Sequence, residues 1–78
     1  MVNDVNRWNY IKKNGGPKRK GQYGLLCMKK SNVGNFHYAV LLCATWNKHA
    51  WDIPEEYAPT AWKFLTKKDL EKGIYQNI

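Results

Sequence analysis

The first two-thirds of the chain contain very little acidic charge. Residues 1–51 hold nine Lys or Arg and one acidic residue, Asp4, which gives a balance of +8. Residues 52–78 hold four basic and five acidic residues, a balance of −1, so the net charge is +7. A surface with so few carboxylates repels cationic partners and favours polyanions, because each neutralised phosphate releases condensed counterions.

Long apolar runs are also missing. No stretch approaches the roughly 18 apolar residues that would span a bilayer. The first residues include Asn3, Asp4, Asn6 and Arg7, where a signal peptide needs an apolar block. We therefore expect a cytoplasmic protein that does not bind membranes.

Cysteine and serine are too scarce for several kinds of site. Cys27 and Cys43 lie in apolar runs, as buried free thiols of a reducing compartment do. With His37 and His49 they form neither a C-x-x-C nor an H-x-x-x-H pair, so we expect no metal and no cofactor. The one serine, Ser31, has no His and carboxylate at the spacing of a catalytic triad.

Aromatic residues, in contrast, are plentiful. Four Trp, five Tyr and two Phe occur among 78 residues, and each buried ring removes roughly 150–250 Å² from water. Residues 1–78 therefore form a single small domain with an aromatic core.

The apolar pattern in the middle of the chain predicts a β-hairpin. Gln22 to Met28 reads as one strand, residues 32–35 as a turn, and Phe36 to Trp46 as a second strand. Both faces of the second strand are largely apolar, which indicates a central strand covered on each side.

Shorter elements follow. A third strand, Ala50 to Ile53, would bring Trp46 close to Trp51. Pro54 and Pro59 would bracket an acidic loop, since each proline removes a donor from a strand ladder. A fourth strand would run over residues 60–65.

The two ends of the chain differ in how clearly they can be assigned. Thr66 and Asp69 match a capping box, which predicts a helix from Lys67 to Lys72 that stops at Gly73. The segment around Trp8 suits a short helix or an extended chain, and its asparagines favour the extended form. The predicted class is α+β, mostly β: an antiparallel sheet of three to four strands with a short C-terminal helix.

The densest positive charge lies in residues 12–21, where a Gly-Gly-Pro centre excludes a helix interior and a central strand. We interpret this segment as a flexible, exposed cationic loop, although charge runs also serve simply as solvated surfaces. Lys29, Lys30 and Arg7 could extend the patch, and Trp8 and Tyr10 could stack on bases, although Trp8 also suits a core position. The predicted binding residues are Lys12, Lys13, Lys18, Arg19, Lys20, Lys29, Lys30, Arg7, Trp8 and Tyr10.

Catalytic motifs find little support. Residues 16–23 have the glycine spacing of a phosphate-binding loop but carry Gln22 and Tyr23 where Lys and Ser or Thr are needed. The stretch from residue 20 resembles the start of an RNA-recognition motif and lacks the later aromatics. Asp52, Glu55 and Glu56 suit acid–base chemistry, a solvated acidic loop, or a partner for the chain's own cationic loop. We expect no enzyme.

The order of aromatic landmarks resembles the DUF551 family of small phage and prophage proteins. The matching positions are Trp8, residues 21–26, Tyr38 to Val40, Trp46, Trp51 and residues 60–65. The chain departs from the family in lacking Leu-Pro after the first Trp, in its dense basic loop, and in its C-terminal helix. The resemblance implies a small β-rich fold and a phage origin, and it implies no activity.

Two functional hypotheses follow from these features. The first is a non-catalytic phage protein in the host cytoplasm whose basic loop engages nucleic acid, DNA or RNA, or a host nucleoprotein complex. The second is a counter-defence inhibitor of anti-CRISPR type that binds a host nucleic-acid machine through protein contacts. A small-molecule substrate is not expected.

Overall fold

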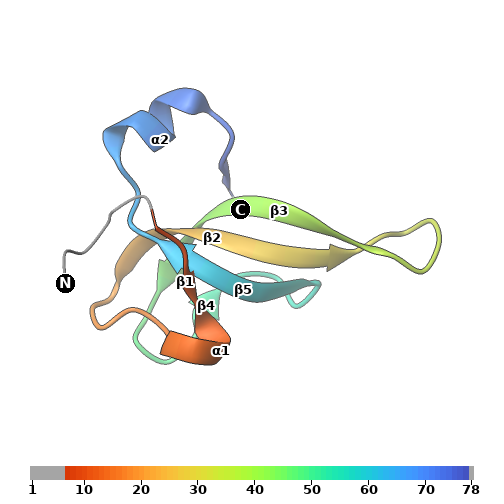
Figure 1. Cartoon of the computed structure of the whole chain (residues 1–78), viewed down its shortest axis with the longest axis horizontal. Coiled ribbons are helices and arrows are strands. Elements are labelled where there is room, and N and C mark those ends of the chain that lie inside the picture. Colours follow the sequence, from red (N-terminus) through yellow and green to blue (C-terminus); the bar gives the residue numbers. More distant parts are fainter. Residues whose placement is uncertain (1–6, 78) are drawn as a thin grey trace.

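The computed structural model describes residues 7–77 and shows a twisted six-stranded sheet with two short helices (Figure 1). The sheet order is β1-β5-β2-β3-β4, and β6 pairs with β3 in parallel. The elements are β1 (Asn9–Tyr10), α1 (Ile11–Asn14), β2 (Gly21–Lys30), β3 (His37–Trp46), β4 (Trp51–Asp52), β5 (Tyr57–Lys63), α2 (Lys67–Lys72) and β6 (Gln76–Asn77). The mostly-β class and the antiparallel sheet are confirmed. The predicted number of strands, three to four, is lower than the six observed. Strands of two residues, such as β1 and β6, are too short to show a periodic pattern.

Strands β2 and β3 form the predicted hairpin, and it is the longest feature of the sheet. Their register runs from Gly21 opposite Trp46 to Lys30 opposite His37. The turn that joins them projects from the rest of the molecule (Figure 1). Trp51 pairs with Trp46 across the next turn, with ring centroids 4.9 Å apart, as the sequence predicted.

Strand β5 begins earlier than expected, because it passes through Pro59. Pro59 lies opposite Cys27 and Ala61 opposite Leu26, so one residue, Thr60, bulges out of the ladder. A proline without an N–H is tolerated at such a bulge. The prediction that Pro59 closes a loop was therefore wrong.

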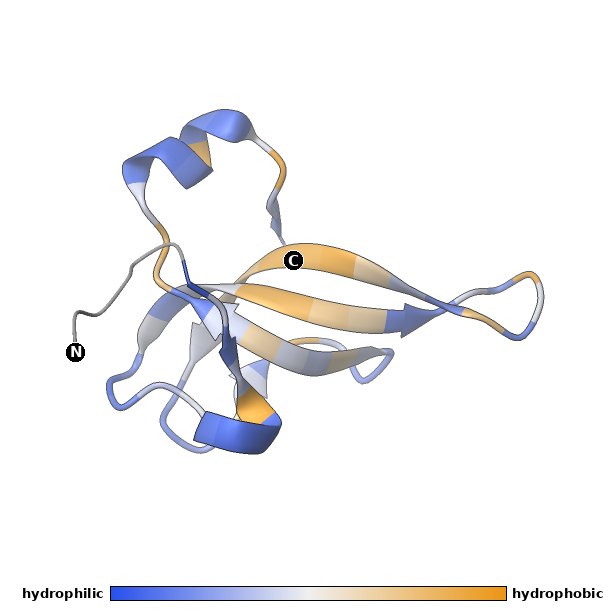
Figure 2. Ribbon diagram, in the orientation of Figure 1, coloured by the Kyte–Doolittle hydropathy of each residue, from blue (hydrophilic) through white to orange (hydrophobic). Residues whose placement is uncertain are grey.

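One face of the sheet, the core face, carries most of the buried apolar side chains. Leu25, Cys27 and Leu42 are fully buried there, together with Tyr23, Ala44 and Trp62. Figure 2 shows the apolar stretches of β2 and β3 that run beside one another.

The opposite face is covered only in part, which corrects the prediction that β3 is covered on both faces. Leu41 and Cys43 are half-buried there and Thr45 is exposed. Residues 37–39 are exposed on both faces, because this end of β3 belongs to the projecting part of the hairpin. Cys27 and Cys43 lie on opposite faces and are free thiols, and burial raises the pKa of Cys27 to about 11.

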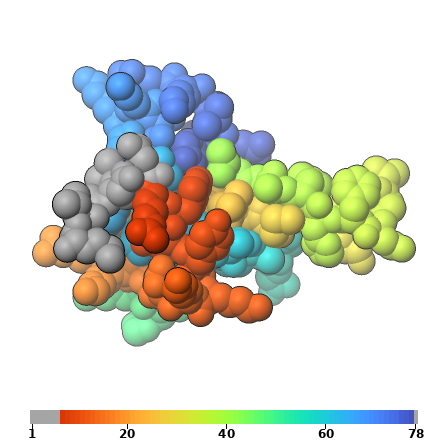
Figure 3. Space-filling view, viewed as in Figure 1, coloured from red at the N-terminus to blue at the C-terminus, as the bar shows by residue number. Residues whose placement is uncertain are grey.

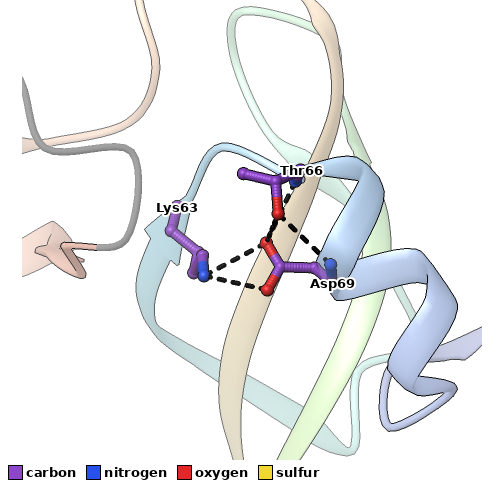
Figure 4. Close-up of polar contacts among 3 residues, drawn as sticks. All are labelled: Lys63, Thr66 and Asp69. Atoms are coloured by element: carbon purple, nitrogen blue, oxygen red, sulfur yellow. Dashed lines mark hydrogen bonds and ion pairs between the residues drawn. The ribbon is translucent and has the colours of Figure 1, made fainter.

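Helix α2 has the predicted bounds and the predicted caps. The Thr66 hydroxyl accepts a bond from the Asp69 N–H, and the Asp69 carboxylate accepts one from the Thr66 N–H (Figure 4). Gly73 ends the helix with a left-handed φ of 66°. These contacts are local, which explains why the sequence alone predicts them.

Asp69 also ties α2 to the sheet. The Lys63 ammonium on β5 lies 3.2 Å from both of its carboxylate oxygens, and both side chains are buried (Figure 4). Hydrogen bonds from the Thr66 backbone and hydroxyl, and then Lys63, outweigh the desolvation of Asp69 and lower its pKa to about 2. Among residues 7–77 no helix is long and apolar enough to cross a membrane.

Candidate nucleic-acid interface

The cationic segment divides into a helical turn and a loop. Lys12 and Lys13 lie on α1, so the prediction that the whole segment 12–21 is a loop was wrong. The helix is possible because it ends at Asn14, before the Gly-Gly-Pro centre. Gly15 follows as the C-cap, and its φ of 73° ends the helical conformation. The remaining residues, 15–20, form the connection to β2, which we call the cationic loop.

Three aromatic side chains hold the backbone of the cationic loop on the sheet. The indole N–H of Trp62 donates to the Gly15 carbonyl at 3.0 Å. The indole of Trp46 donates to the Pro17 carbonyl at 2.8 Å, and the Tyr23 hydroxyl donates to the Arg19 carbonyl at 2.7 Å. Every second residue of the loop is anchored in this way. The loop is therefore neither free of the sheet nor held by its own charges, which corrects the expectation of a flexible connector.

Close packing adds to these hydrogen bonds. Pro17 is buried, and Gly16 lies against the Trp46 ring. A Cβ atom at Gly16 would stand 2.5 Å from the nearest ring carbon, which is closer than real side chains approach. Gly16 and Pro17 thus allow the loop backbone to pack directly against the indole of Trp46.

The charged side chains of the loop are open to solvent. Lys18, Arg19 and Lys20 are exposed, as are Lys12 and Lys13 on α1. The ion pairs within residues 7–77 join Lys29 to Glu56 and Lys63 to Asp69. No described carboxylate therefore neutralises the cations of α1 and the loop.

A groove of about 900 Å³ runs between β1 and the cationic loop. Arg7 and Lys13 contribute to its β1–α1 side, and Lys18 and Arg19 to its loop side. Five aromatic rings also line it: Trp8, Tyr10, Tyr23, Trp62 and Phe64. Figure 3 shows residues 7–20, in red to orange, gathered on the part of the molecule away from the hairpin tip.

Three of the five rings of the groove form a connected cluster. Tyr23 lies 5.3 Å from Trp62 and 5.7 Å from Phe64 between ring centroids, and Trp62 lies 5.4 Å from Phe64. Tyr23 and Trp62 are buried, whereas Phe64 is 45% and Tyr10 is 55% exposed. Trp8 is half-buried, with the Lys63 ammonium 5.8 Å from its ring centroid. The groove thus has fixed inner rings and open outer ones.

Lys29 and Lys30 do not join this groove. They end β2, nine residues from the loop end of that strand, a span of roughly 30 Å at about 3.3 Å per residue. Lys29 lies 3.9 Å from the Glu56 carboxylate and 5.2 Å from the centroid of the Tyr57 ring. The Glu56 charge raises the pKa of Lys29. The two lysines form a separate basic spot near the hairpin tip, which is partly neutralised by the chain itself.

The acidic segment lies apart from the groove as well. Glu56 pairs with Lys29, so the idea that the acidic loop partners the cationic loop was wrong for this residue. Glu55 and His49 line a second hollow, of about 400 Å³, whose other lining residues are mostly apolar. Within residues 7–77 no three His, Cys, Asp or Glu side chains gather closely enough to hold a metal ion.

Three aromatic residues that line the groove were absent from the predicted binding residues, namely Tyr23, Trp62 and Phe64. Trp62 and Phe64 alternate with the buried Lys63 on and beyond β5, and this spacing signals a shared face. Their place beside the cationic loop depends on β5 lying next to β2, a long-range pairing that no local pattern reveals. Lys12 and Lys20 flank the groove in sequence without lining it.

Comparisons with protein families, with curated proteins and with solved structures found no match to this chain. The resemblance to DUF551 proteins and the phage origin it implies stay predictions.

Proposed function

We propose that this protein is a non-catalytic nucleic-acid-binding protein, and that the groove between β1 and the cationic loop receives the nucleic acid. The observation that carries the proposal is the joint lining of one groove by four cations and five aromatic rings. Proteins that bind nucleic acid with little sequence preference combine these two components, a positive track for phosphates and rings for bases.

Electrostatics supplies the affinity in this proposal. Arg7, Lys13, Lys18 and Arg19 line the groove, and Lys12 and Lys20 extend the positive surface. Since no described carboxylate pairs with them, a bound phosphate would not have to displace an ion-pair partner that belongs to residues 7–77. If about five phosphates of a duplex are neutralised, the logarithm of the binding constant should fall with the logarithm of salt concentration at a slope of about −4.5.

The anchored loop lowers the entropic cost of binding. A flexible loop would lose conformational freedom when its lysines met phosphates. Here the backbone is already fixed at the carbonyls of Gly15, Pro17 and Arg19. The side chains alone remain to be ordered, so the charged positions are spaced before the ligand arrives.

Two double variants with the same loss of charge test the site. Lys18→Ser with Arg19→Ser removes two cations from the groove, and Lys29→Ser with Lys30→Ser removes two from the hairpin end. Fluorescence anisotropy should be recorded with random duplex and single-stranded oligonucleotides at 50 mM and 200 mM salt. We expect the groove variant to lose most of its affinity and to show a shallower salt slope, while the hairpin variant stays near wild type.

Other results would reject the proposal. Undetectable binding of the wild-type protein to both oligonucleotides at 50 mM salt would remove it, and equal losses in the two variants would remove the groove as the site. Purification from a host lysate with and without nuclease adds a second check. A protein partner retained after nuclease treatment would support the inhibitor hypothesis instead.

A further inference from the structure

We infer that the groove selects single-stranded nucleic acid, with unpaired bases stacked on the exposed rings of Tyr10 and Phe64. This inference rests on the proposed function and names its ligand class. It depends on how the rings and the cations are arranged with respect to one another, which net charge does not determine.

The two rings are accessible, and one of them is held in place. Tyr10 is 55% and Phe64 is 45% exposed, so each has surface free for a planar ligand. The Phe64 ring contacts the buried rings of Tyr23 and Trp62, at centroid distances of 5.7 and 5.4 Å. A ring supported in this way loses little freedom when a base stacks on it, and stacking accounts for much of the affinity in single-strand sites.

Cations line the same groove as the two rings. Tyr10 lies on β1, between Arg7 and Lys13 in sequence, and Lys18 and Arg19 line the groove from the loop. A single strand can place its phosphates near these cations while its bases turn toward the rings. The groove of about 900 Å³ provides room for bases between its sides.

A duplex cannot make both kinds of contact. Its bases stack on one another inside the helix, so their faces are not available to protein rings. The phosphates of a duplex would reach the cations but leave Tyr10 and Phe64 unused. The same groove should therefore hold single strands more tightly than duplex of equal length.

The test compares four probes of the same length at low salt. They are a 20-nucleotide oligo-dT, a 20-nucleotide oligo-rU, a 20-nucleotide abasic strand that keeps the phosphates but lacks bases, and a 20-base-pair duplex. We expect the oligo-dT or the oligo-rU to bind at least about tenfold more tightly than the abasic strand and the duplex, since each stacked base contributes roughly this factor. Whichever of the oligo-dT and the oligo-rU binds more tightly identifies the preferred ligand as DNA or RNA.

Ring variants locate the effect. Tyr10→Leu and Phe64→Leu keep apolar bulk and remove the ring, and each should lower single-strand affinity about five- to tenfold without changing duplex affinity. Phe36→Leu is the matched control, because Phe36 is also 55% exposed but lies by the hairpin turn. Thermal unfolding establishes that each variant is folded, and Tyr10→Leu carries the test if Phe64→Leu is not.

The outcomes separate this inference from the proposed function. If the abasic strand and the duplex bind as tightly as the oligo-dT and oligo-rU, and the ring variants bind normally, the groove reads only phosphates and the inference fails alone. If no probe binds, the proposed function fails with it. An equal loss in Phe36→Leu would place the stacking elsewhere and also contradict the inference.

Discussion

Gly16 shows at the scale of one residue how the cationic loop is held. The absence of a side chain lets the backbone approach the Trp46 ring, whose N–H then reaches the carbonyl of Pro17. The fit depends on both partners, because a buried carbonyl that loses its donor costs about 1–3 kcal/mol.

Gly16→Ala should therefore destabilise the protein. The added Cβ would stand 2.5 Å from the Trp46 ring, so the loop or the indole must move. Overpacking of this kind costs roughly 1–3 kcal/mol. Urea unfolding followed by tryptophan fluorescence measures the change in the free energy of unfolding and reports on the indole.

Gly15→Ala is a suitable comparison within the same loop. Gly15 has a φ of 73°, and nothing lies within 4 Å of a Cβ at this position. The cost of Gly15→Ala, about 1–2 kcal/mol, comes from the backbone alone. The tryptophan fluorescence spectrum of the folded variant should therefore stay that of wild type. A Gly16→Ala protein with wild-type stability and spectrum would show that the loop is not seated on Trp46.

At the scale of the element, α2 depends on one carboxylate with two roles. Asp69 caps the helix through Thr66 and pairs with Lys63 on β5. Because its pKa is lowered to about 2 in the folded protein, from an ordinary 3.8, protonation is harder in the folded state. Asp69 therefore adds stability that is present above about pH 4 and is lost as the pH falls toward 2.

Asp69→Asn should weaken the dependence of stability on pH in this acidic range. We expect the denaturation midpoint of the wild type to fall between pH 5 and pH 2 by more than that of the variant. The variant should also be less stable at pH 7, because it leaves the Lys63 ammonium buried without its counter-charge. Chemical denaturation across this pH range gives both results.

The exposed Asp52 on β4 supplies the control for that experiment. Asp52→Asn removes the same charge and makes the same change of chemical group at a surface site. It should keep the pH dependence of the wild type. If Asp69→Asn keeps it too, Asp69 does not couple α2 to the sheet in the way its contacts indicate.

At the scale of the whole molecule, stability and surface charge are supplied by different groups. The aromatic cluster around Tyr23 and Trp62 fills the core face, and the loop is attached to it through backbone carbonyls. The ammonium and guanidinium groups of residues 18–20 take no part in these attachments.

Removing the loop charges should thus leave the fold intact. A Lys18→Ser, Arg19→Ser, Lys20→Ser protein should unfold within about 0.5 kcal/mol of wild type, since exposed charges add little to stability. Trp62→Ala should lower the free energy of unfolding by roughly 3–5 kcal/mol, because it leaves a cavity in the core and removes the hydrogen-bond donor to the Gly15 carbonyl. Calorimetry of the two variants tests the contrast, and an unfolded triple variant would contradict the carbonyl anchoring.

The sequence by itself determined the features that arise from neighbours along the chain. Helix α2 follows from its capping box and Gly73, and the β2–β3 hairpin from two apolar runs around a turn. The excess of positive charge in residues 12–20 can likewise be counted directly. Each of these depends on contacts or spacings within a few residues, where local propensity and periodicity are informative.

Only the tertiary structure decided where the charge stands and what accompanies it. The pairing of β5 with β2 brings Trp62 and Phe64, more than 40 residues away in sequence, beside the cationic loop. The three aromatic donors then fix that loop, and the length of β2 separates Lys29 and Lys30 from it. Long-range strand pairing sets these distances, and no pattern within a short window of residues contains that information.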